Sequence, residues 1–268
     1  MTTVEIAPRQ LILSLYGLYA REDGDWLSVA SLISLMADLG ADSAAVRSSV
    51  SRLKRRGVLE AAQREGRAGY ALSPSTLAML REGDLRIWSR PRATAKDGWL
   101  VLVFSVPESE RDRRHALRSV LSGLGFGTAA PGIWVAPATL YDETLRALDR
   151  TGLTSYTEFF RGDYLGAGDV SARMREWWDI DALTELYDEF CAEWRPAVRR
   201  SSPTPAEAFA TYVPMLTSWR RLPYLDPGLP LEHLPPDWPG IEAGELFARL
   251  DEHLRDDAHT HAHGIVHA

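Results

Sequence analysis

The feature that most constrains the fold is a helical pattern that ends in glycine and runs directly into a hairpin pattern, within residues 46–73. "VRSSVSRLKRRG" places Val46, Val50 and Leu53 at i, i+4 and i+7, which defines one buried stripe of a helix. Gly57 ends this pattern, and "VLEAA" and "GYALS" follow as two short β runs around the loop "QREGRA". We therefore expect a helix that leads straight into a two-stranded ribbon.

Two further helices are predicted before this one. "PRQLILSLYGLYA" has leucines at helical spacing, with Pro8 near the start, where proline is tolerated. "WLSVASLISLMADLG" is predicted as the second helix, with Ser28 as its N-cap, and Asp42 or Ser43 caps the next. Only a short turn separates the second and third helices, as in a helix–turn–helix. Three helices followed by a ribbon predict a winged helix–turn–helix domain over residues 1–88.

The positive charge of the chain gathers in the same segment. The chain has 37 acidic and 30 basic residues, a formal net charge of −7, yet the exposed side of the third helix and the hairpin loop are rich in arginine. Arginine pairs with guanine edges in the major groove, and serine bonds to bases or phosphates. A basic helical face is more often simply solvated, so the prediction of DNA binding depends on the ordered context of helix, helix, basic helix and basic hairpin. The predicted DNA-binding residues are Arg47, Ser48, Ser51, Arg52, Lys54, Arg55, Arg64 and Arg67.

The rest of the chain changes pattern twice. Residues 89–98 read as a linker, and residues 99–168 show strand, helix, two strands, helix, strand, the β-α-β-β-α-β order of a ferredoxin-like domain. Residues 169–257 are mainly helical, apart from a proline-rich connector, and the His-rich tail 258–268 is expected to be disordered. The expected fold class is α+β: a winged helix–turn–helix, a ferredoxin-like domain and a C-terminal helical domain.

Beyond these patterns, the chain resembles the PaaX family of transcriptional repressors of phenylacetic acid catabolism. "AVRSSVSRLKRRGVLEA" with "GRAGYALS" looks like the DNA-binding segment of that family. "GWLVLVFSVPESERDRRHALRSVLSGLGFGTAAPGIWVAP" looks like its central domain, and "WRRLPYLDPGLPLEHLPPDWPG" like its C-terminal domain. The resemblance spans roughly residues 8–255, and its central and C-terminal stretches are the more specific ones.

The resemblance implies a regulator rather than an enzyme. It implies a homodimer that binds an inverted-repeat operator in double-stranded DNA and represses a catabolic operon. It also implies an acyl-CoA effector, phenylacetyl-CoA or another acyl-CoA, that releases the DNA, and no bound cofactor.

Such an effector needs cations for its phosphates and an apolar slot for its acyl group. Arginines beside aromatic residues meet this need, although tryptophans more often pack in a core and an arginine-rich helix start more often faces solvent. Trp219, Arg220 and Arg221 form the strongest single cluster. The full set of candidate effector-binding residues is Arg111, Arg114, Arg175, Trp178, Trp219, Arg220 and Arg221.

Histidine and cysteine point to no further site. His259, His261, His263 and His267 alternate in a way that suits a transition metal. A flexible tail must supply the ordering entropy of such a site itself, so no metal site is predicted. The single cysteine, Cys191, reads as a buried structural thiol, and a reducing cytoplasm is expected.

No apolar run approaches the ~20 residues that span a bilayer, so no membrane contact is expected.

Two other classes of function remain open at this stage. One is an enzyme in the ferredoxin-like domain, such as a metal-dependent nuclease that uses Asp163 and Asp169 of "RGDYLGAGD". Turn formation explains these aspartates more simply, and no phosphate-binding glycine loop or nucleophile elbow is present. The other is an interaction scaffold whose winged helix contacts protein instead of DNA.

Overall fold

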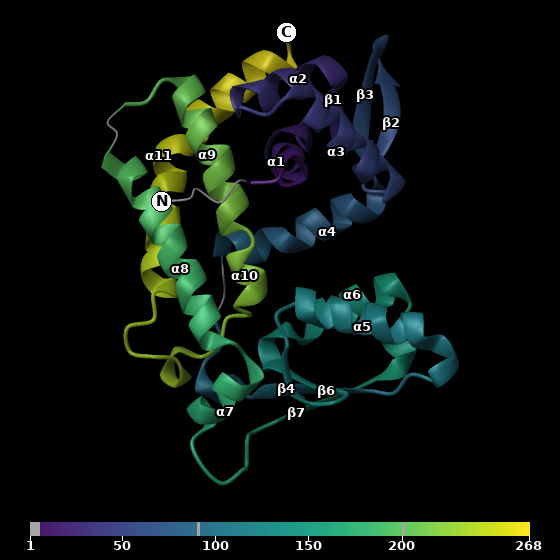
Figure 1. Cartoon of the computed structure of the whole chain (residues 1–268), viewed down its shortest axis with the longest axis vertical. Coiled ribbons are helices and arrows are strands. Elements are labelled where there is room, and N and C mark those ends of the chain that lie inside the picture. The colour runs from purple at the N-terminus through teal and green to yellow at the C-terminus, as the bar shows by residue number, and fades with distance from the viewer. Residues whose placement is uncertain (1–5, 90–91, 200–201) are drawn as a thin grey trace. The chain divides into compact units, whose positions relative to one another are not determined.

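The computed structural model describes residues 6–89, 92–199 and 202–268, and the chain divides into two compact units (Figure 1). The first unit contains the residues up to Asp84 together with Glu189–Arg220 and Glu242–Ala268. The second contains Leu85–Asp188 and Arg221–Ile241. Each unit has one antiparallel β-sheet among helices, so the fold is mixed α+β, as predicted.

The N-terminal part of the first unit follows the predicted order of helices and hairpin, with one additional strand. Its elements are α1 (Pro8–Leu15), a π-helical turn (Tyr16–Ala20), β1 (Trp26–Ser28), α2 (Val29–Asp38), α3 (Ser43–Arg55), β2 (Leu59–Arg64), β3 (Arg67–Leu72) and α4 (Pro74–Asp84). The three strands form an antiparallel sheet in the order β1-β3-β2. The Ser28 hydroxyl accepts a hydrogen bond from the Ser31 amide at 2.9 Å, which confirms Ser28 as the N-cap of α2.

Strand β1 was not predicted, because its residues were assigned to the second helix. They precede the N-cap, where the backbone is extended, and they pair with β3. Gly69 on β3 permits this pairing, since a Cβ at that position would lie 2.4 Å from the Leu27 carbonyl oxygen and 2.4 Å from the Trp26 ring. The third strand therefore depends on a contact distant in sequence.

Helices from the C-terminal part of the chain complete the first unit. They are α8 (Ile180–Trp194), which both units share, a 3-10 turn (Arg195–Arg199), α9 (Pro205–Trp219) and most of α11 (Gly240–Val266). Helix α9 continues through Pro214 and packs on α1, where the Thr217 and Ser14 hydroxyls lie 2.7 Å apart. The buried Trp219 ring stacks on Phe247 of α11 at a centroid distance of 4.5 Å.

The C-terminal tail is helical, so the expectation of disorder over 258–268 was wrong. Helix α11 runs to Val266, and its end lies beside α2 in Figure 1. Leu250, Leu254, Ala258 and Ala262 are all buried at four-residue spacing and continue one apolar stripe into the tail. Packing of this stripe supplies the free energy that an isolated His-rich tail lacks.

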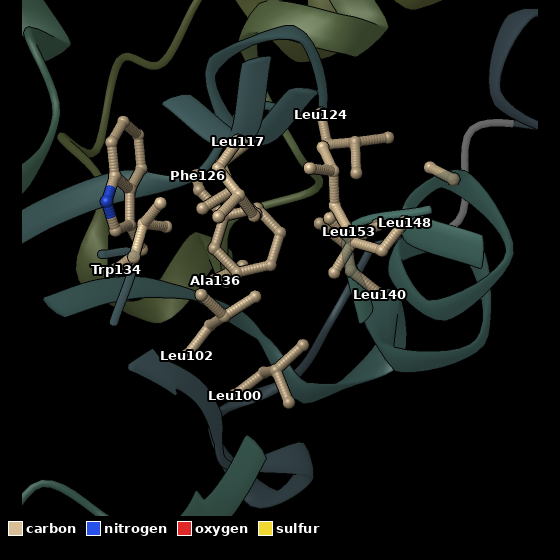
Figure 2. Packing of buried hydrophobic residues seen from close by; sticks show 13 residues of the cluster. Leu100, Leu102, Leu117, Leu124, Phe126, Trp134, Ala136, Leu140, Leu148 and Leu153 are labelled. Carbon is tan, nitrogen blue, oxygen red and sulfur yellow. The ribbon is translucent and has the colours of Figure 1, made fainter. Parts of the chain in front are cut away.

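The second unit contains the predicted β-α-β-β-α-β order. Its elements are β4 (Trp99–Phe104), α5 (Arg111–Gly123), β5 (Gly127–Ala130), β6 (Ile133–Pro137), α6 (Tyr141–Thr151) and β7 (Thr157–Gly162). The four strands form an antiparallel sheet in the order β5-β6-β4-β7. Figure 2 shows Leu117 of α5, Leu148 of α6 and Leu124, directly after α5, in the same buried core as Leu100 and Leu102 of β4.

The remaining residues of the second unit surround this sheet. A π-helical turn (Leu85–Ser89) begins this unit, which also contains α7 (Val170–Trp177) and α10 (Leu222–Leu225). Its 3-10 turns are Ala95–Asp97, Glu108–Glu110, Ala138–Leu140, Thr154–Tyr156 and Leu231–His233. Of the expected linker 89–98, residues 90 and 91 lie outside the described residues. The rest is anchored, because Arg92 pairs with the buried Asp226 and the Ala93 amide donates to the Gly228 carbonyl at 2.9 Å.

The expected C-terminal domain over 169–257 divides between the two units. Helix α9 and most of α11 join the first unit, whereas α7, α10 and the proline-rich connector join the second. Trp178, directly after α7, donates from Nε1 to the Gly125 carbonyl of the second unit at 2.7 Å. Local sequence cannot assign such helices, because the partners that bury them lie far away in the chain.

Candidate DNA-binding surface

Helix α3 presents the predicted serine and arginine face. Val46, Val50 and Leu53 are buried against the unit, as predicted from their spacing. The six predicted DNA-binding residues on this helix are all exposed: Arg47, Ser48, Ser51, Arg52, Lys54 and Arg55. The structure thus gathers four cations and two hydroxyls on the solvent side of one helix.

The position of α3 is fixed at its start. The Asp42 carboxylate accepts hydrogen bonds from the amides of Ala44 at 2.9 Å and Ala45 at 3.1 Å, so Asp42 is the N-cap. Gly40 takes the left-handed conformation, with φ 76°, in the turn between α2 and α3. This short turn sets α3 directly after α2, with its basic face outward.

A groove of about 340 Å³ runs beside this face. Val29, Leu32 and Ile33 of α2 and Tyr70 of β3 line one part of it, and Lys54 lies over the Tyr70 ring at 5.5 Å. Arg47, Lys54 and Arg55 also border the groove. It is an open depression with apolar walls and a cationic rim.

The β2–β3 hairpin is tighter than predicted. Its strands meet at a two-residue turn formed by Glu65 and Gly66, both with positive φ, 49° and 76°. This is the conformation of a type I′ hairpin turn, in which glycine carries no steric cost. Arg67 lies near the tip and is exposed, and its Nη2 is 3.9 Å from Glu65 Oε2.

Arg64 has a structural role that the sequence pattern did not reveal. Its Nη1 donates to the Asp23 carbonyl at 2.9 Å and its Nη2 to the Gly24 carbonyl at 2.6 Å, and its guanidinium lies over the Trp26 ring. The side chain therefore ties the hairpin to the loop that precedes β1. Gly24 in that loop has φ 69°, and a Cβ there would approach Arg64 Nη1 at 2.6 Å.

The hairpin is also fixed from its other side. The buried Tyr16 hydroxyl donates to the Tyr70 carbonyl at 3.0 Å, and burial raises the pKa of Tyr16 above its ordinary value, with a smaller effect from Tyr70. Trp26 Nε1 donates to the Ala62 carbonyl at 3.4 Å. The hairpin is thus bonded to Tyr16 and Trp26 of the same unit as the basic helix.

Family models match almost the entire chain. The model described as PaaX-like protein matches residues 7–76, the PaaX protein central Cas2-like domain matches 92–174, and the PaaX-like protein C-terminal domain matches 178–264. The chain belongs to the PaaX family. The third match extends into the His-rich tail, beyond the stretch in which the sequence alone showed the resemblance.

A curated relative and a solved structure are also similar to this chain. A curated relative, the transcriptional repressor PaaX of Escherichia coli (strain K12), is 29% identical over 262 residues, which cover 93% of this chain and 81% of the relative. Since this relative is a repressor, the prediction of a regulator rather than an enzyme is supported. A solved structure, the uncharacterized protein Rv0674 from Mycobacterium tuberculosis, matches the fold with a TM-score of 0.58 and 22% identity over 96% of this chain and 99% of that one.

In this PaaX family chain, the three residues of the predicted effector cluster Trp219–Arg221 have different surroundings. Trp219 is 1% exposed and packs against Phe190 and Phe247. Arg220 donates to the Gln10 carbonyl at 3.1 Å. Arg221 is exposed and begins the next segment of the second unit. The alternative of core packing therefore describes Trp219 better than a ligand slot does.

The other effector candidates lie in the second unit, apart in sequence. Trp178 is buried and packs on Trp99, while Arg175 on α7 is exposed. Arg111 pairs with Glu108 at 2.8 Å, and Arg114 donates to the Val106 carbonyl at 3.0 Å. These two arginines therefore bond to residues of the segment before α5.

A pocket of about 520 Å³ in the second unit was not anticipated from the sequence. Its walls include Tyr141 and Phe159, whose rings meet edge to face at 5.4 Å, and the half-exposed Phe160. Arg161 at its border is fixed by two hydrogen bonds from its guanidinium to the Asp97 carbonyl, at 3.2 and 2.9 Å. The pocket therefore combines aromatic walls with one oriented cation. The sequence of strand β7 on its own does not predict a cavity.

The residues considered for other chemistry have structural roles. The Asp169 carboxylate accepts from the Ser171 amide at 3.0 Å and so caps α7, which supports the turn explanation, while Asp163 is exposed. Cys191 is buried, as predicted. Among the described side chains, no group of three histidine, cysteine or acidic residues is arranged to hold a metal ion. None of the described helices is long and apolar enough to cross a membrane.

Proposed function

We propose that this chain is a transcriptional repressor that binds operator DNA through a winged helix–turn–helix. Helices α2 and α3 are the helix–turn–helix, α3 reads the major groove, and the β2–β3 hairpin is the wing. The observation that carries the proposal is the exposed face of Arg47, Ser48, Ser51, Arg52, Lys54 and Arg55 on the second helix of the pair. The repressor named among the relatives supports the same function.

The test is the affinity of the purified chain for its own promoter region, measured by fluorescence anisotropy over a range of salt concentrations. Arg52→Ala with Arg55→Ala should weaken operator binding by about 1–3 kcal/mol for each arginine that reads a base. Arg249→Ala is the matched control, because it removes one exposed arginine from α11. Unchanged affinity in the double variant would refute the assignment of α3 as the recognition helix.

We further propose that the repressor acts as a homodimer on an inverted repeat. Two recognition helices must then lie about one helical turn of DNA apart, ~34–36 Å, to enter successive major grooves. Footprinting should show two protected half-sites at that spacing. A single protected half-site bound by one chain would contradict the dimer.

The signal that releases DNA is proposed to be an acyl-CoA, such as phenylacetyl-CoA. An effector that binds better to a conformation with different spacing of the helices shifts the population away from the DNA-binding state. Thermal-shift assays with a panel of acyl-CoAs should reveal the ligand, because a ligand of the folded state raises its melting temperature. If no member of the panel changes either melting or DNA binding, the acyl-CoA proposal fails.

The pocket beside β7 fits an acyl group. Aromatic walls suit a phenyl ring, and Arg161 offers a fixed cation near the entrance. Phe160→Ala should reduce the thermal shift caused by the effector, while operator affinity without effector stays unchanged. Trp219→Phe, which tests the cluster favoured from sequence, should leave that shift intact.

A further inference from the structure

We propose that His259, His261 and His267 are positioning residues that hold the DNA-binding segment in its binding geometry. This inference rests on the proposed DNA-binding function and assigns a role to the His-rich tail. Each of the three imidazoles contacts a different carboxylate of the N-terminal segment, and all of these residues lie in the first unit.

The three histidine–carboxylate contacts reach two segments, the loop before β1 and the end of α2. His259 Nε2 lies 2.9 Å from Glu22 Oε2, and His267 Nε2 lies 3.2 Å from Asp23 Oδ2, in the loop before β1. His261 Nε2 lies 2.8 Å from Asp38 Oδ2, at the last residue of α2. In the His259 and His261 pairs the imidazole donates and the carboxylate accepts, whether the ring is a neutral Nε2–H tautomer or protonated, while His267 and Asp23 form a close charged contact when the ring is protonated.

The loop contacted by His259 and His267 is the one that fixes the wing. The carbonyl of Asp23 accepts from Arg64 Nη1, and the neighbouring Gly24 carbonyl accepts from Arg64 Nη2. A continuous series of contacts therefore runs from His267, directly after α11, through Asp23 to Arg64 at the end of β2. A displaced loop would move the hairpin, because both Arg64 bonds end on its backbone.

The contact with Asp38 acts on the recognition helix instead. Asp38 ends α2, and the turn that follows leads to the Asp42 N-cap of α3. The His261 ring is itself fixed against Phe209 of α9 at a centroid distance of 5.1 Å. This histidine thus links α9 and α11 to the turn that orients α3.

The spacing of the tail produces this arrangement. His259 and His263 lie on one side of α11, and His267, directly after the helix, continues the four-residue spacing, with ring centroids 5.9 and 4.1 Å apart in sequence order. Ala258 and Ala262, both fully buried, let the helix approach closely enough for the flanking imidazoles to reach the carboxylates. Gly264 does not interrupt the helix.

These pairs are partly exposed: the side chains of His259 and Glu22 are 41% and 68% accessible, and those of His261 and Asp38 are 20% and 40% accessible. Pairs of this kind contribute little to global stability. Single alanine variants should therefore stay folded, so that a loss of affinity reports on position and not on unfolding.

The experiment compares operator affinity of the full chain for wild type, the triple variant of His259→Ala, His261→Ala and His267→Ala, and the matching triple glutamine variant. The alanine variant should bind operator about three- to tenfold more weakly while it melts as a folded protein. Glutamine places an amide N–H where Nε2 lies, so the glutamine variant should recover most of the affinity. Thr260→Ala, an exposed change on the same helix, is the control and should bind like wild type.

A double-mutant cycle tests the path through the loop. His267→Ala should lose much of its effect on affinity when Arg64→Ala is already present, whereas His261→Ala should keep its effect, because it acts through Asp38. Equal operator affinity of the folded alanine variant and wild type would overturn the positioning role. If wild type itself binds no operator, the proposed function falls and this inference falls with it.

Discussion

Arg64 Nη2 donates to the carbonyl oxygen of Gly24 at 2.6 Å, across the sheet from the residue's own strand. The arginine that the sequence placed at a wing tip to meet DNA is thus exposed but bonded to the loop before β1, while Arg67, three residues later, is exposed near the tip with no bond to that loop among the described residues. The two arginines of the hairpin should therefore differ in what they do for DNA binding.

This difference is measurable in the salt dependence of operator affinity. Each phosphate contact releases counterions, so Arg67→Ala should lower the slope of log K against log salt by about 1. Arg64→Ala should leave the slope nearly unchanged and lower affinity only through the looser hairpin. A slope change of about 1 in Arg64→Ala would show that this side chain leaves the loop to contact phosphate.

The N-cap of α3 offers a second prediction. Asp42→Ala removes the carboxylate that accepts from the Ala44 and Ala45 amides. The free energy of unfolding should fall by about 1 kcal/mol, as for other lost N-caps, measured by urea denaturation. Asp42→Ser keeps a capping hydroxyl and should recover most of that stability. Equal stability of the alanine variant and wild type would mean that water or a neighbouring group replaces the cap.

Local pattern was enough to predict the elements that carry their own signals. The buried stripe of Val46, Val50 and Leu53, the capping residues Ser28 and Asp42, and the strand and helix order of the second unit all follow from periodicity and turn chemistry. In these segments, the free energy that selects the structure comes from nearby residues.

The features that were missed depend on contacts distant in sequence. Strand β1 forms because Gly69, more than forty positions later, leaves room for Trp26. The tail is helical because its alanines are buried and its histidines contact the end of α2 and the loop before β1, which no single window of the sequence contains. The spacing of Ala258 and Ala262 after Leu254 is the sequence signal that the last helix continues, whereas the predicted helix ended at Asp257.

Buried tyrosines give the chain a defined response to alkaline pH. Burial raises the pKa values of Tyr16, Tyr19 and Tyr212 above their ordinary value, and the hydrogen bond to Asp251 adds to the effect at Tyr212. The folded state then keeps protons that the unfolded chain loses above pH ~10. Stability should be constant with respect to these groups below that pH and fall as the pH rises above it.

Urea denaturation between pH 9 and 11 measures this loss. Tyr19→Phe should flatten the alkaline decline, and at neutral pH it should cost little, since the Tyr19 hydroxyl is buried with no hydrogen-bond partner among the described residues. Tyr141→Phe, at an exposed position, is the control and should leave the decline as in wild type. An alkaline decline of the same slope in Tyr19→Phe and wild type would contradict the assignment to Tyr19.

The strongest single effect on stability is expected at Asp226. This residue is 1% exposed, and its carboxylate accepts from the Tyr187 hydroxyl at 2.9 Å and from the amides of Gly228 and Leu229, and it pairs with Arg92. Asp226→Ala leaves a largely buried guanidinium and a buried hydroxyl without their acceptor, which should cost about 3–5 kcal/mol. Asp237→Ala, an exposed change in the same proline-rich segment, should stay within about 0.5 kcal/mol of wild type. Urea midpoints at equal m-values measure both, and a loss below about 1 kcal/mol in Asp226→Ala would show that the segment holds its place without this carboxylate.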